Sequence, residues 1–424
     1  MRILVVGGGG REHALVAALH ADDPSHLLHA APGNPGTAAL ATNLDIAADD
    51  LDRLADAVDA HAIDLTVVGP EVPLALGLAD RLRAEGRTVF GPGAAAAQIE
   101  ASKAFAKEVM AAAGVPTAAS ATFADLDEAL AYIASHAEPL VVKASGLAAG
   151  KGAVVCASRT EAATVAREML ADGQFGDAGG TIVVEAFLEG EELSVFAITN
   201  GHEIRLLPSA QDHKRIGEGD TGANTGGMGA YAPVSIATPA LLDRVEREVL
   251  RPTLRELERR GAPYRGVLYA GLMIHPDGTP NVVEFNCRFG DPEAEVILPL
   301  VEHGLTGLLD AAARGEPLPE VTLRDAAAVT TVLASRGYPE SSSKGDPITL
   351  PDTLPDGVTV YHAGTRQTDA GLVTAGGRVL AVTAVAPTFA AAQERSRATA
   401  EAIAFEGKQY RRDIGYREAA RSEP

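Results

Sequence analysis

The chain has 424 residues, enough for two to four domains of about 150 residues each. Apolar residues make up 46% and charged residues 22%, as in ordinary globular proteins, which argues against a disordered, collagen-like or coiled-coil chain. The formal net charge of −21 disfavours nucleic acids and anionic membrane surfaces as partners. It does not exclude an anionic small ligand, because backbone N–H groups and local basic residues can bind phosphate.

The cysteine content and the pattern of apolar residues indicate the cellular compartment of the protein. Cys156 and Cys287 are the two cysteines, too few for a disulfide framework or a four-cysteine zinc site. No run of about 18 apolar residues predicts a membrane span, and the N-terminus shows no secretory pattern. These features predict a protein of the reducing cytoplasm.

Residues 1–100 alternate strand and helix signals. Short apolar runs predict strands at 3–6, 65–68 and 88–90, and helical spacing predicts helices at 11–19 and 73–85. Strands separated by helices indicate a doubly wound, Rossmann-like parallel sheet.

The rest of the chain predicts two further domains. A helix is expected at 94–113, followed by a smaller α+β unit at about 120–190. The other elements expected are strands at 140–143, 153–156, 181–185, 192–199, 267–274 and 281–285, helices at 161–170, 239–260 and 390–403, and glycine-punctuated strands within 358–385. The predicted domains are 1–100, 101–324 and 325–424, and the last is a β-rich α+β domain.

Four consecutive glycines, 7–10, follow the first strand and open the first helix. Residues without a Cβ let backbone N–H groups approach an anion at a helix N-terminus. The dinucleotide fingerprint G-x-G-x-x-G fails in both registers, because its third glycine would be Glu12 or His13. A phosphate site of another kind is therefore preferred over a tight turn that binds nothing.

Two lysines flank a glycine-rich connection between predicted strands, in Lys143-Ala-Ser-Gly-Leu-Ala-Ala-Gly-Lys151-Gly152. The spacing is not that of a Walker A loop, and Gly152 stands where a Ser or Thr would hold Mg²⁺. A glycine-rich hairpin can instead close over a triphosphate. A surface hairpin with solvated lysines is the alternative, but a lysine inside an apolar strand needs a partner.

The strand at 281–285 ends in the richest polar cluster, EFNCRFGDPE at 284–293. Alternation along a strand places Glu284 and Asn286 on one face, and carboxylate and amide oxygens are ligands that Mg²⁺ accepts beside substrate phosphates. Arg288 can grip a phosphate or a carboxylate through two hydrogen bonds. Cys287 is expected to be a packed apolar side chain and not a nucleophile.

Two further segments carry candidate groups. Glu185 and Glu192 lie seven residues apart in VEAFLEGEELS and could bracket a nucleotide, although acidic loops are usually only solvated. The glycine-rich loop 211–231 contains Gln-Asp-His-Lys-Arg, a basic cluster in an acidic chain that suggests contact with an anion.

Together these motifs resemble the phosphoribosylamine–glycine ligase family of the ATP-grasp superfamily. The matching stretches are GGGGREHAL at 7–15, VVGPEVPL at 67–74, SKAFAK at 102–107, KASGLAAGKG at 143–152, VEAFLEGEELS at 184–194, SAQDHKRIGEGDTGANTGGMGAYAP at 209–233, EFNCRFGDPEAE at 284–295 and FEGKQYRRDIG at 405–415. One departure is Glu295, where the family is expected to have Gln.

The resemblance implies ATP-dependent ligation of glycine to 5-phosphoribosylamine through glycyl phosphate, with Mg²⁺ or Mn²⁺, in a monomer that makes purines. Implied ATP-binding residues are Lys103, Lys143, Ser145, Gly146, Gly150, Lys151, Gly152, Glu185, Ala186, Phe187, Leu188 and Glu192. Implied substrate-binding residues are Gly9, Gly10, Arg11, Glu12, Gly69, Pro70, Glu71, Lys214, Asn224, Thr225, Gly226 and Gly227. The metal would be held by Glu284 and Asn286, and the implied catalytic residues are Arg288, Asp291 and Asp212. The unit at about 120–190 would be a lid that shields the acyl phosphate from water.

Three rival interpretations are weighed against this one. An ATP-grasp carboxylase would keep the fold but activate bicarbonate. A nucleotide sensor without turnover would be expected to lack the metal pair, yet Glu284 and Asn286 are both present. A nicotinamide dehydrogenase is opposed by the missing third glycine.

Overall fold

The computed structural model describes residues 1–148, 152–172 and 176–422. Its N-terminal segment forms the predicted parallel sheet, in the order β3-β2-β1-β4-β5. The elements are β1 (Arg2–Gly7), α1 (Gly10–Asp22), β2 (Leu27–Pro32), η1 (Thr37–Ala39), β3 (Thr42–Asn43), α2 (Leu51–Ala60), β4 (Leu65–Val68) and β5 (Val89–Phe90). Residues 3–6 of β1 are completely buried, as expected for a central strand covered on both faces.

Two helices that the sequence predicts as continuous are each divided in two. The prediction at 73–85 is wrong in this respect, because α3 (Glu71–Ala75) and α4 (Leu78–Ala84) are separated at Gly77, whose φ of 91° is left-handed. The helix predicted at 94–113 is likewise split into α5 (Ala94–Ala101) and α6 (Lys103–Ala113). Ser102 is extended there, and its Oγ caps α6 by accepting from the Phe105 N–H.

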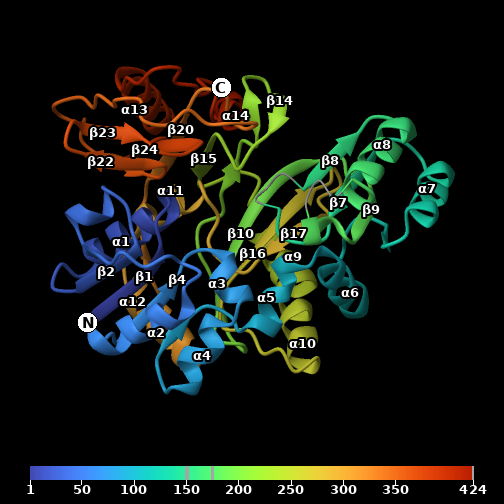
Figure 1. Ribbon diagram of the computed structural model, residues 1–424, viewed down its shortest axis with the longest axis horizontal. Coiled ribbons are helices and arrows are strands. Elements are labelled where there is room, and N and C mark those ends of the chain that lie inside the picture. Colours follow the sequence, from blue (N-terminus) through green and yellow to red (C-terminus); the bar gives the residue numbers. More distant parts are fainter. Residues whose placement is uncertain (149–151, 173–175, 423–424) are drawn as a thin grey trace.

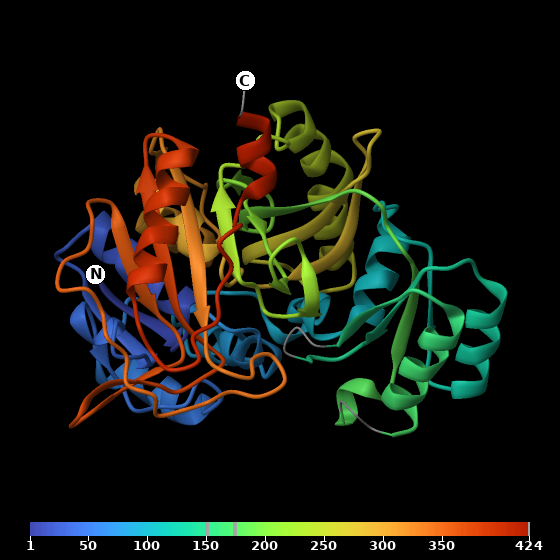
Figure 2. The same ribbon diagram turned by 90° about the horizontal axis from the view of Figure 1, so that it is seen from above.

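A four-stranded antiparallel sheet, β6-β9-β7-β8, and two helices form the unit expected as a lid. Its elements are β6 (Ser120–Phe123), α7 (Leu126–Ser135), β7 (Leu140–Ala144), β8 (Ala153–Cys156), α8 (Arg159–Leu170), η2 (Gly176–Gly179) and β9 (Ile182–Ala186). The unit has its own small apolar core and projects from the rest of the molecule (Figures 1 and 2). In the β7–β8 hairpin Lys143 pairs with Ala153.

The centre of the molecule is a third sheet, β11-β10-β16-β17. Its elements are β10 (Glu191–Thr199), β11 (Ile204–Leu206), β16 (Gly266–Ile274) and β17 (Pro280–Asn286), and the helical stretch beside them consists of α9 (Pro239–Val245), the π-helical η3 (Glu246–Leu250) and α10 (Arg251–Arg259). Strand β17 pairs antiparallel with β16, so that Glu284 lies opposite Gly271 and Asn286 opposite Tyr269.

The C-terminal segment shares a sheet with the middle of the chain. Strands β12 (Gln211–Asp212) and β15 (Gly229–Ala232) extend the C-terminal strands in the order β12-β15-β20-β24-β21. The remaining elements are β13 (Arg215–Gly217), β14 (Thr221–Asn224), α11 (Ala294–Ile297), η4 (Leu298–Leu300), β18 (Val301–His303), α12 (Leu305–Arg314), β19 (Thr322–Leu323), β20 (Ala327–Ala334), β21 (Val358–His362), β22 (Thr365–Thr368), β23 (Gly371–Thr374), β24 (Arg378–Ala386), α13 (Phe389–Ala402) and α14 (Tyr416–Ser422). The loop 211–231 is thereby fixed to the C-terminal segment, and the domain boundaries stay predictions.

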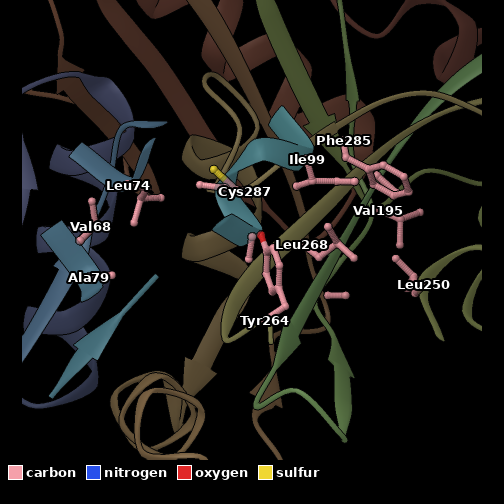
Figure 3. Packing of buried hydrophobic residues seen from close by; sticks show 14 of the residues in the cluster. Val68, Leu74, Ala79, Ile99, Val195, Leu250, Tyr264, Leu268, Phe285 and Cys287 are labelled. Atoms are coloured by element: carbon pink, nitrogen blue, oxygen red, sulfur yellow. The ribbon is translucent and has the colours of Figure 1, made fainter. Parts of the chain in front are cut away.

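Apolar packing joins the N-terminal and central sheets into one body. A single buried cluster contains Val68 and Leu74 near the N-terminal sheet and Val195, Leu268 and Phe285 of the central sheet (Figure 3). Cys287 belongs to this cluster and is only 2% exposed, as the sequence predicts. Among the described helices, none has the length and apolar character needed to cross a membrane.

Candidate active site

A cavity of about 490 Å³ lies where the lid, the central sheet and both terminal segments meet. Nineteen residues that the sequence singles out line it, namely Arg11, Glu71, Lys103, Lys143, Gly152, Glu185, Ala186, Phe187, Leu188, Glu192, Asp212, Lys214, Asn224, Thr225, Gly226, Glu284, Asn286, Arg288 and Asp291. The fold therefore gathers groups that lie up to 280 residues apart in the sequence (291 − 11 = 280) around one space.

Other predicted residues lie behind the cavity wall or outside the description. Those that do not line the cavity are Gly9, Gly10, Glu12, Gly69, Pro70, Ser145, Gly146 and Gly227. Ser145 and Gly146 support Lys103: the Ser145 Oγ accepts from the Ala104 N–H, and the Gly146 carbonyl accepts from the Lys103 Nζ at 3.2 Å. Gly150 and Lys151 lie outside the described residues.

Two lysines pair with the carboxylate of Glu185 at the root of the lid, and Lys103 lines the same cavity. The two Glu185 oxygens lie 3.0 Å from the Lys107 Nζ and 2.9 Å from the Lys143 Nζ. The Lys143 Nζ also donates to the Val283 carbonyl on β17, which ties the lid to the central sheet. Burial lowers the pKa of Lys103, although Glu284 opposes this. A buried cluster of this kind suits a strongly anionic ligand such as a triphosphate.

The predicted metal pair lies on the cavity side of β17. Burial raises the pKa of Glu284, but the positive charges of Lys214 and Lys143 outweigh burial, and the pKa lies below its usual value. Asn286 is 7% exposed, and its side chain lines the same space. An ionised carboxylate beside an amide oxygen fits a divalent cation that completes its shell with phosphate oxygens and water.

Among the described residues no larger metal cluster competes with this pair. In the part of the chain that the structure describes, no group of three or more His, Cys, Asp or Glu residues could hold a metal ion. Two protein ligands are what a Mg²⁺ shared with a nucleotide usually has.

A second charged cluster comes from the loop 211–231 and faces β10. The Lys214 Nζ lies 2.9 Å from an oxygen of Glu192 and 4.0 Å from one of Asp212. Burial raises the pKa of Asp212 well above its usual value, and Glu293 and Glu192 raise it further, although Lys214 opposes this. Burial lowers the pKa of Lys214, but the negative charges of Asp212 and Glu192 outweigh burial, and the pKa lies well above its usual value. Lys214 is therefore charged and interacts with the carboxyl groups of both Glu192 and Asp212.

Arg288 is held between two carboxylates. Its Nη2 lies 2.8 Å from Glu100 and its Nε lies 3.3 Å from Glu71. Burial lowers the pKa of the guanidinium, but Glu100 and Glu71 raise it far above its usual value. Glu100 also accepts from the Cys287 N–H at 2.8 Å, so α5 fixes the turn that follows β17.

The glycine turn owes much of its composition to the packing of Glu12. The Glu12 carboxylate accepts from the Gly9 N–H at 2.7 Å and from the Arg11 Nε at 2.6 Å. A Cβ at Gly7 or Gly69 would collide with the Glu12 side chain. Glycine at these positions therefore lets a buried carboxylate fold back over the helix N-terminus, while Arg11 points to the cavity.

Several cavity residues escaped the sequence analysis. The charged and polar ones among them are Glu100, Lys107, Tyr269, Glu293 and Arg378. Glu100 lies three residues before Lys103, a spacing that could have drawn attention to it within the helix predicted at 94–113, although the structure divides that helix at Ser102. The Glu293 carboxylate accepts from the Tyr269 hydroxyl at 2.7 Å, a contact that depends on the tertiary fold.

Comparison with known families identifies this architecture. Three family models match consecutive parts of the chain: the phosphoribosylglycinamide synthetase N domain at residues 1–100, its ATP-grasp (A) domain at 101–294 and its C domain at 328–417. The chain belongs to the phosphoribosylglycinamide synthetase family. The match with the family predicted from the sequence motifs is thereby confirmed.

Relatives of this family are similar over the whole chain. A phosphoribosylamine–glycine ligase from a Nostoc species is 50% identical over 98% of this chain and 99% of its own, and one from Chlorobaculum tepidum is 48% identical over 98% and 99%. The crystal structure of a phosphoribosylamine–glycine ligase from Thermotoga maritima has a TM-score of 0.86 at 35% identity, covering 98% of this chain and 100% of its own. A Campylobacter jejuni biotin carboxylase has a TM-score of 0.74 at 13% identity over 96% and 92%, which shows a shared fold.

Proposed function

We propose that this phosphoribosylglycinamide synthetase family member joins glycine to 5-phosphoribosylamine at the cost of ATP, giving glycinamide ribonucleotide, ADP and phosphate. The observation that carries the proposal is one cavity in which a lysine cluster, the Glu284–Asn286 pair and the arginines 11 and 288 line the same space. Such a space can hold a nucleotide and a phosphorylated amine side by side.

The reaction consists of two displacements. In the first, a glycine carboxylate oxygen attacks the γ-phosphorus of ATP, and the bond to the β–γ bridging oxygen breaks to release ADP. In the second, the amine nitrogen of phosphoribosylamine attacks the carbonyl carbon of glycyl phosphate, and phosphate leaves. Phosphoryl transfer of this kind depends mainly on positioning and on neutralising charge.

The residues of the cavity divide these tasks. We assign Lys103 and Lys143 to the ATP phosphates. Val141, Ala153 and Val155 of the lid strands β7 and β8 line the same cavity, and a lid over it would protect the acyl phosphate from water. We assign Glu192 to the ribose, residues 185–188 to adenine, and the 211–231 loop with Asp212, Arg288 and Asp291 to glycine and the acyl phosphate.

Glu284 and Asn286 would hold a divalent cation, which when bound neutralises charge on the β- and γ-phosphates. ATP-grasp enzymes work with ATP and a divalent metal. We propose Mg²⁺, with Mn²⁺ as a substitute, because hard oxygen ligands suit both ions.

The decisive experiment measures ADP release with glycine and freshly prepared phosphoribosylamine, each omitted in turn. Release that needs glycine, together with glycinamide ribonucleotide that appears only when both substrates are present, is the expected result. ADP release that depends on bicarbonate and not on glycine would favour the carboxylase alternative. A monomeric state and a cytoplasmic location stay predictions, and size-exclusion chromatography with light scattering tests the first.

A further inference from the structure

Arg378 is a cavity residue from a part of the chain to which neither motif nor fold gives a role. It is the first residue of β24, and its side chain lines the cavity beside Asp291 and Gly226. The C-terminal segment therefore reaches into a site built mainly by the two preceding segments. Arg378 contacts Asp291, which lies 87 residues earlier in the sequence.

The hydrogen bonds of Arg378 leave part of its guanidinium available. Its Nη1 donates to the Asp291 carbonyl at 2.7 Å and to the Gly226 carbonyl. Its Nη2 forms an ion pair with the Asp291 carboxylate at 3.1 Å. A guanidinium has five N–H donors, so Nε and one hydrogen of Nη2 have no partner in the described part of the chain.

The charges around Arg378 leave room for an anion. Asp291 is the carboxylate within ion-pair distance of it among the described residues. The neighbouring Glu295 is 1% exposed, and neither of its carboxyl oxygens has a hydrogen-bond partner. Burial and then the charge of Asp291 raise the pKa of Glu295 well above its usual value. Burial thus disfavours the charged form of Glu295 beside the arginine.

A second guanidinium reaches this part of the cavity from the N-terminal segment. The Arg11 Nη1 donates to the Phe289 carbonyl at 3.2 Å, two residues before Asp291 along the chain, and the Arg11 Nε donates to Glu12 at 2.6 Å. Arg11 and Arg378 both line the cavity. Two arginines that line one cavity can form a site for a dianion, because the planar fork of arginine matches the oxygens of a phosphate.

We propose that Arg378 is a substrate-binding residue that grips, together with Arg11, the phosphate monoester of the phosphoribosyl substrate. The inference rests on the proposed function and adds the C-terminal segment to that site. Binding there would link the N-terminal and C-terminal segments through the ligand, while Asp291 holds Arg378 in place when the ligand is absent.

The test uses the full chain, ADP and two probes that differ only in the phosphate, ribose 5-phosphate and ribose. Isothermal titration with the Arg378→Gln variant should show an affinity for ribose 5-phosphate that is about 10- to 100-fold weaker than that of the wild type. The affinities for ribose and for ADP should not change. Arg378→Lys should retain part of the affinity, and Arg366→Gln, which changes an exposed arginine of β22, should behave as the wild type.

Two outcomes of the titrations overturn the inference. Unchanged binding of ribose 5-phosphate by Arg378→Gln, or no binding by the wild type, excludes a phosphate contact. An equal loss of ADP affinity would make Arg378 a structural residue of the cavity wall. A wild type that makes no glycinamide ribonucleotide would refute the proposed function instead, and the ribose 5-phosphate titration would still decide the role of Arg378.

Discussion

At the scale of single residues, Glu284 carries the sharpest expectation. Glu284→Gln keeps the shape of the side chain but removes the charge that attracts a divalent cation, and we expect kcat to fall at least about 100-fold. The fold should persist, because Lys143 and Lys214 still have Glu185 and Glu192 as ion-pair partners. Steady-state assays with circular dichroism check both points, and Glu258→Gln on the exposed face of α10 is the control. Full activity of the Glu284 variant would refute the metal assignment.

Glu295 leads to a prediction about pH. Because burial raises its pKa in the folded protein above the value in the unfolded chain, the folded state binds more protons between those two values. Stability is therefore lost as pH rises through this interval, by up to about 1.4 kcal/mol per pH unit. Glu295→Gln lacks this titration.

We therefore expect Glu295→Gln to gain thermal stability relative to the wild type as pH rises from about 5 to about 8. Thermal unfolding followed across this range measures the difference. The exposed Glu258→Gln variant should show a difference from the wild type that does not vary with pH. A Glu295→Gln difference that is equally flat would mean that Glu295 is ionised or partnered in the folded protein.

At the scale of elements, a segment near the C-terminus clasps the β13–β14 hairpin. Arg411, which is 1% exposed, donates to Asp220 of the hairpin at 2.7 Å and to Asp413 at 2.7 and 2.8 Å. His213 beside the hairpin accepts from the Gly415 N–H at 2.8 Å. The hairpin begins directly after Lys214 and ends at Asn224, and both residues line the cavity. The contacts of Arg411 and His213 therefore hold these two residues of the cavity wall in place.

Arg411→Ala should therefore destabilise the protein by about 3 kcal/mol, because it removes a buried side chain and the ion-pair partner of Asp413, although Asp220 keeps Arg417 as a partner. Thermal unfolding and limited proteolysis of the hairpin measure the effect. The neighbouring Arg412 is exposed and forms only a loose ion pair with Glu218, so Arg412→Ala should cost less than about 1 kcal/mol. Equal effects of the two variants would show that the clasp does not matter.

The same scale shows what sequence patterns can and cannot predict. Alternation along β17 was enough to place Glu284 and Asn286 on the cavity side, because a period of two fixes the face of each residue. The breaks at Gly77 and Ser102 were missed, since the helical pattern continues on both sides of each break. Arg378 could not be found either, because its place depends on how β24 joins strands from the middle of the chain.

At the scale of the whole molecule, the cavity lies where the N-terminal, central and C-terminal segments meet, from Arg11 to Arg378. A ligand in this space contacts a surface that unfolding would destroy. It should therefore stabilise the whole folded protein by mass action, about 2.7 kcal/mol at 100 times its Kd.

Measurements with ADP and Mg²⁺ separate the stabilisation caused by the nucleotide from the stabilisation caused by the metal ion. ADP alone should raise the midpoint of thermal unfolding through the lysine cluster around Glu185, and Mg²⁺ should add a further increase through Glu284 and Asn286. The Glu284→Gln variant should keep the increase caused by ADP and lose the increment caused by Mg²⁺, whereas Glu258→Gln should keep both. Differential scanning calorimetry with each ligand alone and with both measures the increments. If Mg²⁺ stabilised the Glu284 variant as much as the wild type, the cation would have to bind elsewhere, and the charge on β17 would need another explanation.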